Sequence, residues 1–286
     1  EDLRTELLAL AVPGDNEIDR LGRADVRLGR LFAQAANELL VRAKVPPAQV
    51  RAIGSHGQTI RHRPGQTAPF TLQIGDPNVI ATATGLPVVA DFRRKDMALG
   101  GQGAPLVPAF HDAMFRQPGT DRVIVNIGGI ANLTVLPGEA ARPILGFDTG
   151  PGNTLLDGWS RRILSKPMDR DGAFAASGRL QTGLLALLLR DPYFSQPAPK
   201  STGPEYFSPD WLQRHLAAFG EIAPADVQAT LLALTTHSIA DSIRRQSASR
   251  QPEVFVCGGG AHNVALMRSL SANLPGRDRR LWICGC

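Results

Sequence analysis

The sequence predicts an α/β protein. Apolar segments of strand length alternate with segments of helical periodicity, and glycine-rich turns follow several of the strands. The 286 residues are 43% hydrophobic and 20% charged, which is ordinary for a globular protein. A chain of this length holds two domains or one large α/β unit.

A long amphipathic helix is predicted near the start of the chain. Residues 16–44 carry apolar side chains at helical spacing, and Pro46 and Pro47 end the pattern. We expect this helix to bury one stripe, made of Ile18, Leu21, Val26, Leu28, Leu31, Phe32 and Leu39.

A capped helix and three short strands follow in the first half. Asp76 is placed to cap the N-terminus of a helix that starts at Pro77 and ends near Gly85. The strands are predicted at residues 50–53, at 70–74 and, as a buried strand, at 87–90.

The second half predicts a hairpin and a strand–turn–helix unit. Residues 122–126 and 130–136 are apolar and flank Gly128-Gly129, which predicts a β-hairpin. Residues 253–257 predict a buried strand that enters the turn 258–260 and a helix through Leu270. Two further segments are predicted, a helix over 224–246 and a long loop rich in Pro, Ser and Gly over 193–209.

Charge and composition narrow the function classes. The net charge is +5, but the arginines are dispersed and form no basic run, so no nucleic-acid partner is expected. No apolar run is long enough to cross a bilayer and no signal-like segment begins the chain, which predicts no membrane association and a cytoplasmic location. The three cysteines are too few for a disulfide framework, and Cys284 and Cys286 lack the second ligand pair of a zinc site.

Three glycine-rich turns are candidates for holding phosphate, at residues 126–132, 148–152 and 257–263. Backbone N–H groups in such turns bind anions, and glycine lets the backbone approach a ligand closely. None of the three matches the GxGxxG fingerprint or the GxxxxGK[ST] P-loop, which favours another mode of nucleotide binding. Glycine turns also join strands for purely conformational reasons, and that interpretation stays open for each turn.

Asp148 is the strongest candidate for a catalytic group. It follows an apolar run at 143–146 and precedes a glycine turn and an expected helix. This placement predicts a carboxylate beside unpaired N–H groups of a helix start, where anions and developing negative charge are favoured. Such a carboxylate can activate water or a hydroxyl group next to a phosphate.

Seven sequence blocks carry these motifs, namely Gly54–Thr59, Gln73–Asp76, Ala90–Arg94, Gly100–Leu106, Asn126–Leu133, Gly146–Asn153 and Cys257–Asn263. In this order they resemble the anhydro-N-acetylmuramic acid kinases of bacterial cell-wall recycling, over residues 17–274. The resemblance implies the fold of the actin/sugar-kinase/Hsp70 superfamily, with two RNase H-like domains at residues 1–125 and 126–286. It also implies a homodimer.

The resemblance implies a hydrolytic kinase reaction. Such an enzyme adds water across the anhydro bridge of 1,6-anhydro-N-acetylmuramic acid and phosphorylates the freed O6, using ATP and Mg²⁺. The products are N-acetylmuramic acid 6-phosphate and ADP. Asp148 matches the catalytic aspartate of the family and would take a proton from the attacking water.

The other blocks supply the binding residues that the resemblance implies. For ATP and its phosphates they are Asn126, Gly128, Gly129, Asn132, Gly150, Gly152, Gly258, Gly259, Gly260 and Asn263. For the sugar they are His56, Arg93, Arg94, Gln102 and Pro105. Either arginine could bind a carboxylate or phosphate in a bidentate manner or form a surface salt bridge, and His56 could instead be a core histidine. No protein ligand to a metal is predicted, and Asp91 and Asp169 are expected to cap loops.

Both ends of the chain depart from the family pattern. Family members begin with a strand and a Gly-Thr-Ser turn that grips the phosphates opposite residues 126–132, and this chain begins after that segment. Residues 275–286 do not resemble the closing strand and helix. We therefore expect domains that lack these elements and a polypeptide that turns over poorly or not at all.

Alternative functions stay open at this point. A plain sugar kinase of the same superfamily would use Asp148 toward a free hydroxyl group and consume no water. A phosphatase acting on polyphosphate is a related possibility. A non-catalytic fragment would bind the sugar without hydrolysing ATP.

Overall fold

The chain forms two compact units, Glu1–Gly103 and Ala104–Cys286, in a computed structural model that describes residues 2–65, 67–247, 249, 251–274 and 281–283. Both units contain helices and β-strands, so the predicted α/β class is confirmed. The division lies upstream of the predicted boundary between residues 125 and 126. That boundary would cut the strand β5 (Arg122–Ile127), which is paired on both edges inside one sheet.

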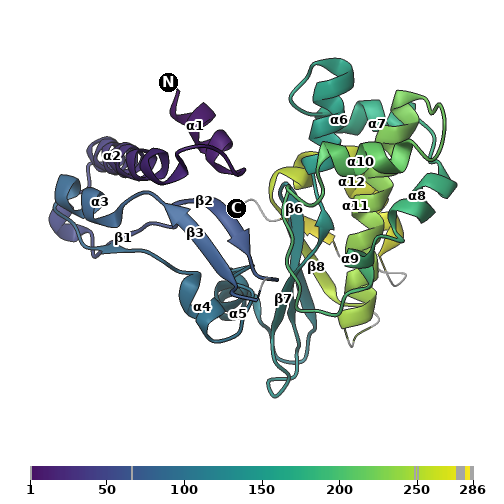
Figure 1. The fold of residues 1–286 in the computed structure, drawn as a ribbon. Helices are drawn as coiled ribbons and strands as arrows, with labels where there is room; N and C mark the ends of the chain where they lie inside the picture. Colours follow the sequence, from purple (N-terminus) through teal and green to yellow (C-terminus); the bar gives the residue numbers. More distant parts are fainter. Residues whose placement is uncertain (1, 66, 248, 250, 275–280, 284–286) are drawn as a thin grey trace. The chain divides into compact units, whose positions relative to one another are not determined.

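The first unit combines helices with two short β-ribbons (Figure 1). β1 pairs in parallel with β4, and β2 pairs antiparallel with β3. The elements are α1 (Leu3–Leu10), α2 (Glu17–Ala43), η1 (Pro47–Gln49), β1 (Ile53–Gly54), β2 (Gln58–Arg63), β3 (Phe70–Ile74), α3 (Pro77–Thr84), β4 (Val88–Val89) and α4 (Arg94–Ala98).

The long helix α2 forms as predicted, but only part of the predicted stripe is buried. Leu28 is buried, and Leu21 and Phe32 are partly buried against the same core cluster. Ile18, Leu31 and Leu39, which we expected to be buried, are 86%, 50% and 65% exposed. α3 instead packs closely on a small residue, since a Cβ on Gly29 would lie 2.9 Å from the carbonyl oxygen of Asp76. Close approach of two backbones therefore selects the contact face, and the buried positions are Ala24, Leu28, Gly29 and Ala33.

The predicted capped helix is confirmed as α3. The Asp76 carboxylate accepts a hydrogen bond from the N–H of Asn78, and Pro77 is the first helical residue. Gly85 ends the helix in the left-handed region, at φ 68°, which glycine adopts without strain.

The three short strands of the first half agree with the sequence to different degrees. β3 covers the predicted residues 70–74, and the strand predicted at 50–53 is reduced to β1. The strand predicted at 87–90 forms as β4, but it is not buried, because Val89 is 54% exposed. β4 belongs to a two-stranded ribbon with β1, which leaves it with one paired edge.

A five-stranded sheet in the order β7-β6-β5-β8-β9 lies at the centre of the second unit. β5 and β6 form the predicted hairpin, and β8 runs parallel to β5, as a strand reached through a helical crossover does. The other strands are β6 (Ile130–Leu136), β7 (Leu145–Pro151), β8 (Glu253–Cys257) and β9 (Leu281–Ile283).

β9 corrects the expectation for the end of the chain. We predicted no closing strand within residues 275–286, yet residues 281–283 pair in parallel with β8. An open sheet edge presents unpaired backbone groups, so an extended segment can pair there without a typical strand sequence. Residues 275–280 and 284–286, which include Cys284 and Cys286, lie outside the described residues.

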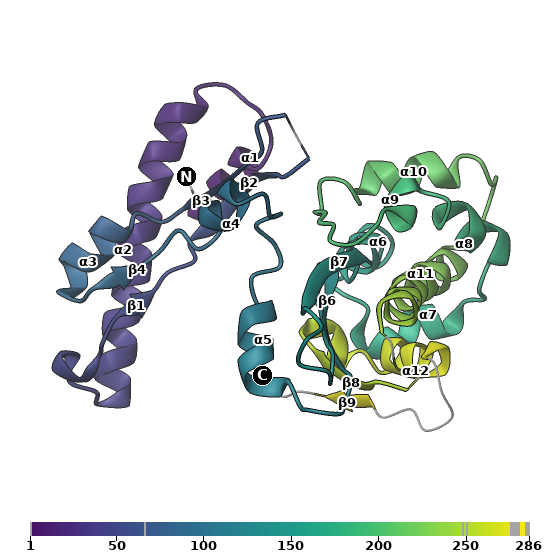
Figure 2. The same cartoon turned by 90° about the horizontal axis from the view of Figure 1, so that it is seen from below.

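Helices cover one face of this sheet and α5 covers the other (Figure 2). Val123, Val125 and Ile127 of β5 join Leu231 of α11 in the main core. On the α5 side, His111 Nδ1 lies 2.9 Å from the Thr134 hydroxyl oxygen. The helices are α5 (Pro108–Phe115), α6 (Thr154–Leu164), η2 (Arg170–Gly172), α7 (Ala173–Ser177), α8 (Thr182–Leu188), α9 (Pro192–Ser195), α10 (Pro209–Leu216), α11 (Pro224–Gln246), η3 (Gly259–His262) and α12 (Val264–Asn273).

The central helix α11 is expected to dominate the stability of the second unit. Leu234 is completely buried within the main core, whereas Leu180 is 44% exposed. We expect Leu234→Ala to lower the free energy of unfolding by about 2–5 kcal/mol, because it removes apolar contacts and leaves a cavity. Urea denaturation measures the loss, with Leu180→Ala as the matched control. Equal losses in the two variants would contradict the packing described here.

Candidate active site

Two turns of the second unit are joined by three backbone hydrogen bonds. The N–H groups of Gly152, Asn153 and Thr154, at the start of α6, donate to the carbonyl oxygens of Gly128 and Gly129 at 2.8, 2.8 and 3.0 Å. A helix start leaves such N–H groups without partners inside the helix, and here the hairpin turn supplies them. The prediction of unpaired N–H groups at this helix start is therefore wrong for these three residues.

The hairpin turn itself offers donors to an anion. The N–H groups of Gly128 and Gly129 have no hydrogen-bond partner among the described residues. A Cβ would meet no atom closer than 3.5 Å at Gly128 or 3.3 Å at Gly129, and neither residue has a positive φ. Gly128 therefore has room for a side chain, and the two N–H groups of the turn are available to an anion such as phosphate.

Four other predicted glycines are required by the fold, because a Cβ on any of them would overlap a neighbour. A Cβ on Gly258 would lie 2.5 Å from Asn126 Oδ1, and one on Gly260 would lie 2.4 Å from Ile127 Cγ2. A Cβ on Gly152 would lie 2.4 Å from the Gly128 carbonyl oxygen, and one on Gly150 would lie 2.8 Å from Phe194 Cε1. These close contacts bring the hairpin, the end of β7 and the turn after β8 together. The structure thus gathers the three glycine turns that the sequence singled out.

A cavity of about 360 Å³ opens beside this cluster. Gly259 lies on its wall, and a Cβ there would meet only Asn153 Nδ2, at 3.8 Å. The cavity follows the carboxyl end of β8, the side of a parallel pair where ligands commonly bind. It is lined by Asn153, Asp157, Met168, Asp169, Arg170, Asp171, Gly259, His262 and Asn263.

Three side chains at this cavity have distinct roles. The Asp169 carboxylate accepts hydrogen bonds from two N–H groups of α7, at 2.8 and 2.9 Å, which confirms that it is a capping residue. Asn263 Oδ1 accepts from the N–H of Leu266 and caps α12. Asp157 is different, because burial raises the pKa of its carboxyl group, with Asp169 adding to the effect and Arg161 opposing it. A carboxyl group whose charged form is disfavoured by burial is a candidate for ligand binding.

Asp148 lies within β7 and not at its end, and it is 6% exposed. The pairing of β6 with β7 is irregular here: Ala131 pairs with Gly150 and Asn132 with Asp148, which leaves Thr149 as an extra residue. A β-bulge of this kind re-aims the neighbouring side chain. Asn132, a predicted phosphate residue, therefore lies directly opposite Asp148.

α9 and the loop that follows it hold Asp148 through three hydrogen bonds. The N–H of Thr202 donates to Asp148 Oδ2 at 3.0 Å, and the N–H of Asp148 donates to the Lys200 carbonyl oxygen at 2.9 Å. The Tyr193 hydroxyl group donates to the Asp148 carbonyl oxygen at 2.7 Å. Burial, together with the Asp148 carboxylate, raises the pKa of Tyr193, which keeps this hydroxyl group a donor.

The predicted sugar-binding residues of the first unit are partly brought together. Arg93 Nε donates to His56 Nε2 at 2.8 Å, and Arg93 also donates to the Gly103 carbonyl oxygen at 2.6 Å. The Asp96 carboxylate accepts from the N–H of Gly103, which ties down the loop that contains Gln102. His56 is exposed, so the alternative of a core histidine is wrong.

Arg94 and Pro105 take no part in these hydrogen bonds. Arg94 forms an exposed ion pair with Asp91, the surface salt bridge that the sequence left open. Pro105 belongs to the second unit, where a Cβ on Gly146 of β7 would lie 3.2 Å from its ring.

The described residues contain no group of three or more His, Cys, Asp or Glu side chains that could hold a metal ion. Among the same residues, no helix has both the length and the apolar character needed to span a membrane.

Comparison with known proteins decides the family. The family described as anhydro-N-acetylmuramic acid kinase matches residues 1–280. The chain belongs to the anhydro-N-acetylmuramic acid kinase family. A protein of that name from Shewanella amazonensis (strain ATCC BAA-1098 / SB2B) is 58% identical over 276 residues, which cover 96% of this chain and 74% of the relative. One from Shewanella oneidensis is 56% identical over 280 residues, covering 96% and 75%.

Likeness to solved structures is weaker than this sequence similarity. The activator of the 2-hydroxyisocaproyl-CoA dehydratase from Clostridium difficile is 17% identical, with a TM-score of 0.39, and the match covers 82% of this chain and 87% of that one. A ROK family glucokinase from Streptomyces griseus is 15% identical, with a TM-score of 0.36, over 89% and 82%. Matches this distant do not bear on the function of the kinase-family chain.

Sequence reasoning missed several residues of this kinase-family site. Tyr193, Lys200 and Thr202 lie in the segment predicted to be a loop, and no motif marks them. Asp157 is four residues from the family block that ends at Asn153, so one further helical turn would have reached it. Asp96 carries no signal beyond its proximity to Arg93.

Gly152 and Gly128 should respond differently to a methyl group. Gly152→Ala is expected to lower the free energy of unfolding by about 1–3 kcal/mol, because its Cβ overlaps the Gly128 carbonyl oxygen. Gly128→Ala has room for its Cβ and is expected to stay within about 0.5 kcal/mol of the parent. Urea denaturation measures both, and similar losses would show that the two turns do not touch as described.

Asp157 should cost stability at neutral pH. Its folded pKa is raised, so between the unfolded value of 3.8 and the raised value the folded state holds more protons, and stability falls as the pH rises through that window. Asp157→Asn removes the buried charge and with it this loss of folding stability. Its melting temperature should exceed that of the parent at pH 7, and the gain should shrink as the pH falls through that window toward 3.8. Asp210→Asn makes the same substitution at an exposed position and is the control.

Proposed function

We propose that the protein catalyses ATP-dependent hydrolytic phosphorylation of 1,6-anhydro-N-acetylmuramic acid, giving N-acetylmuramic acid 6-phosphate for peptidoglycan recycling. The carrying observation is the buried Asp148 carboxylate, oriented by the N–H of Thr202, in a chain 58% identical to a protein named for this kinase activity. The fold we propose is that of the actin/sugar-kinase/Hsp70 superfamily, with RNase H-like domains.

ATP is proposed to bind across the gathered turns of the second unit. The free N–H groups of Gly128 and Gly129 would donate to phosphate oxygens, which is the usual role of such a turn. The nucleoside would occupy the 360 Å³ cavity beside Gly259, where Asp157 can accept a hydrogen bond from a ribose hydroxyl group. Asn126 and Asn263 would support these turns through the contacts described above.

Mg²⁺ fits this arrangement as an ion carried by the nucleotide. The described residues offer no cluster of three or more ligands, and Mg²⁺ in kinases is held largely by phosphate oxygens, water and one or two carboxylates. When bound, Mg²⁺ supplies neutralisation of the charge that develops on the phosphates.

Asp148 is proposed as the general base. Its carboxylate takes a proton from water as the water oxygen bonds to the anomeric carbon, and the bond from that carbon to the bridging oxygen breaks. The bridging oxygen, now O6, bonds to the γ-phosphorus of ATP while the bond from that phosphorus to the bridging oxygen of ADP breaks. The hydrogen bond from the N–H of Thr202 fixes the orientation of this carboxylate.

The remaining parts of the proposal rest on the family resemblance. Arg93 and His56, joined by a hydrogen bond, would contact the sugar with Gln102, and a guanidinium suits the carboxylate of its lactyl group. Arg94 and Pro105 stay weaker candidates for sugar binding. A homodimer and a cytoplasmic location complete the proposal.

Asp148→Asn is expected to reduce turnover by about 10²- to 10⁴-fold, because it removes the general base while the side chain can still accept from Thr202. The assay supplies the anhydro sugar and Mg-ATP in ¹⁸O-water, and mass spectrometry reads the product. A phosphorylated sugar with one heavy oxygen on C1 is expected. Asp210→Asn is the matched control and should keep the parent rate.

Two results would contradict the proposal. Phosphorylation of ordinary N-acetylmuramic acid without uptake of heavy oxygen would indicate a plain sugar kinase. Binding of the sugar without any ATP hydrolysis would indicate a non-catalytic protein.

A further inference from the structure

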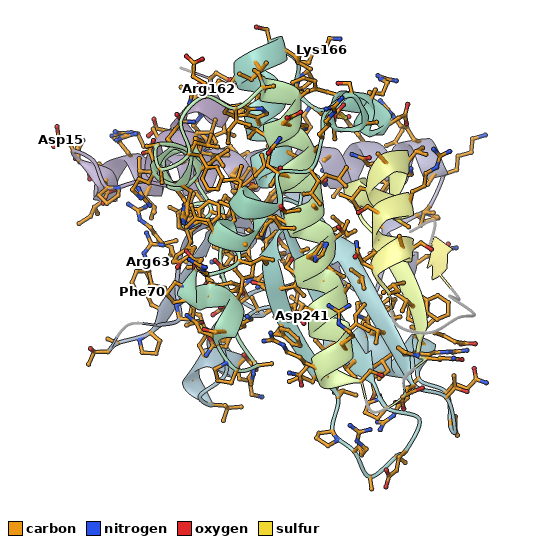
Figure 3. All side chains as sticks on the ribbon, turned by 90° about the vertical axis from the view of Figure 1, so that its right-hand side faces the viewer. Asp15, Arg63, Phe70, Arg162, Lys166 and Asp241 are labelled. Carbon is orange, nitrogen blue, oxygen red and sulfur yellow. The ribbon has the colours of Figure 1, made fainter. Side chains whose placement is uncertain are left out.

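A second cavity, of about 300 Å³, lies in the same unit between β7, the loop after α9 and the C-terminal half of α11. It shares no lining residue with the cavity beside Gly259. Its charged and titratable wall consists of Lys200, His237, Asp241, Arg244 and Arg245. Asp241, near the end of α11, marks its position in Figure 3.

Lys200 is a buried cation that forms no ion pair within 4 Å among the described residues. It is 7% exposed, and its ammonium group donates to the carbonyl oxygens of Tyr193 and Phe194 at 2.7 and 3.4 Å. The ammonium also lies 4.4 Å from the centre of the Tyr193 ring. No carboxylate forms an ion pair with it in the described part of the chain. Buried ammonium groups are normally paired, because leaving water is costly for a charge.

The rest of the wall adds positive charge. Asp241 is shared by Arg244 and Arg245, at 3.5 and 2.6 Å, so one carboxylate faces two guanidinium groups and Lys200. Burial lowers the pKa of His237, which leaves that side chain neutral at pH 7. Burial, with a contribution from Arg245, lowers the pKa of Lys200 to about 8, so this ammonium group is still mostly protonated at pH 7. The cavity therefore carries an excess of positive charge.

Residues with hydroxyl groups also line the cavity. Thr149, Ser195 and Ser238 each donate their own proton to a backbone carbonyl oxygen, at 3.2, 2.9 and 3.0 Å. The lone pairs of these oxygens are then available to hydroxyl groups of a ligand. The wall thus combines cations for an acidic group with acceptors for hydroxyl groups.

We propose that this cavity binds a small anion that carries hydroxyl groups, of the sugar phosphate class, with Lys200 and Arg245 contacting the acidic group. The site is separate from the proposed kinase site and does not depend on that activity. The two sites are nevertheless neighbours in the fold, because the carbonyl oxygen of Lys200 accepts a hydrogen bond from the N–H of Asp148.

The test measures the pKa of the Lys200 ammonium group by NMR. The chain has four lysines, and the other three, Lys44, Lys95 and Lys166, are exposed, so lysine labelled with ¹³C at Cε gives few signals to resolve. Glucose 6-phosphate is the probe, with glucose as the neutral comparison. We expect glucose 6-phosphate to raise the pKa of Lys200 from about 8 by about one unit, which corresponds to tenfold tighter binding to the protonated form. Glucose should leave it unchanged.

Substitutions of exposed arginines complete the test, because they leave the buried Lys200 in place and are not expected to disturb folding. Arg245→Gln should weaken binding of glucose 6-phosphate about tenfold, and Arg162→Gln, far from Asp241 in Figure 3, should not change it. A Lys200 pKa that does not respond to glucose 6-phosphate overturns the proposal. An equal effect of the two arginine variants also overturns it. The readout does not involve catalysis, so failure of the kinase assay leaves this result unaffected.

Discussion

The site depends on three backbone hydrogen bonds between the start of α6 and the carbonyl oxygens of Gly128 and Gly129. A helix start must find acceptors for its first N–H groups, and here the hairpin turn is the acceptor. This single constraint fixes the hairpin against the end of β7. It also requires Gly152, because a Cβ there would occupy the space of the Gly128 carbonyl group. The N–H groups that stay available to a ligand consequently belong to the hairpin and not to these positions at the helix start.

The segment from Tyr193 to Thr202 has two structural tasks that meet at Lys200. Its backbone and the Tyr193 hydroxyl group hold Asp148 in a bulged part of β7. Its lysine side chain turns a buried cation toward a separate cavity. The segment is anchored by an aromatic cluster in which the Tyr193 and Phe207 rings meet edge-on at 5.4 Å. Rigid packing of this kind lets a loop without regular structure position a carboxylate.

Elements with a local physical cause were predictable from the sequence. α3 has its cap at Asp76 and its end at Gly85, and the β5–β6 hairpin has apolar strands around a glycine pair. The capping role of Asp169 was expected as well. β2 was missed because Gln58–Arg63 has no apolar alternation and is held by pairing with β3. Contacts with a distant strand leave no local pattern to read.

The sequence by itself determined the α/β class, the kinase family and the three glycine turns with Asp148 among them, because these follow from residue types at fixed spacing. Only the tertiary structure decided which glycines are open to a ligand. Gly128 and Gly152 look alike in sequence, yet a Cβ is tolerated at one and overlaps a carbonyl group at the other. It also decided which face of α2 is buried and which loop holds Asp148. These outcomes depend on the distance between segments far apart in the chain, which local sequence does not encode.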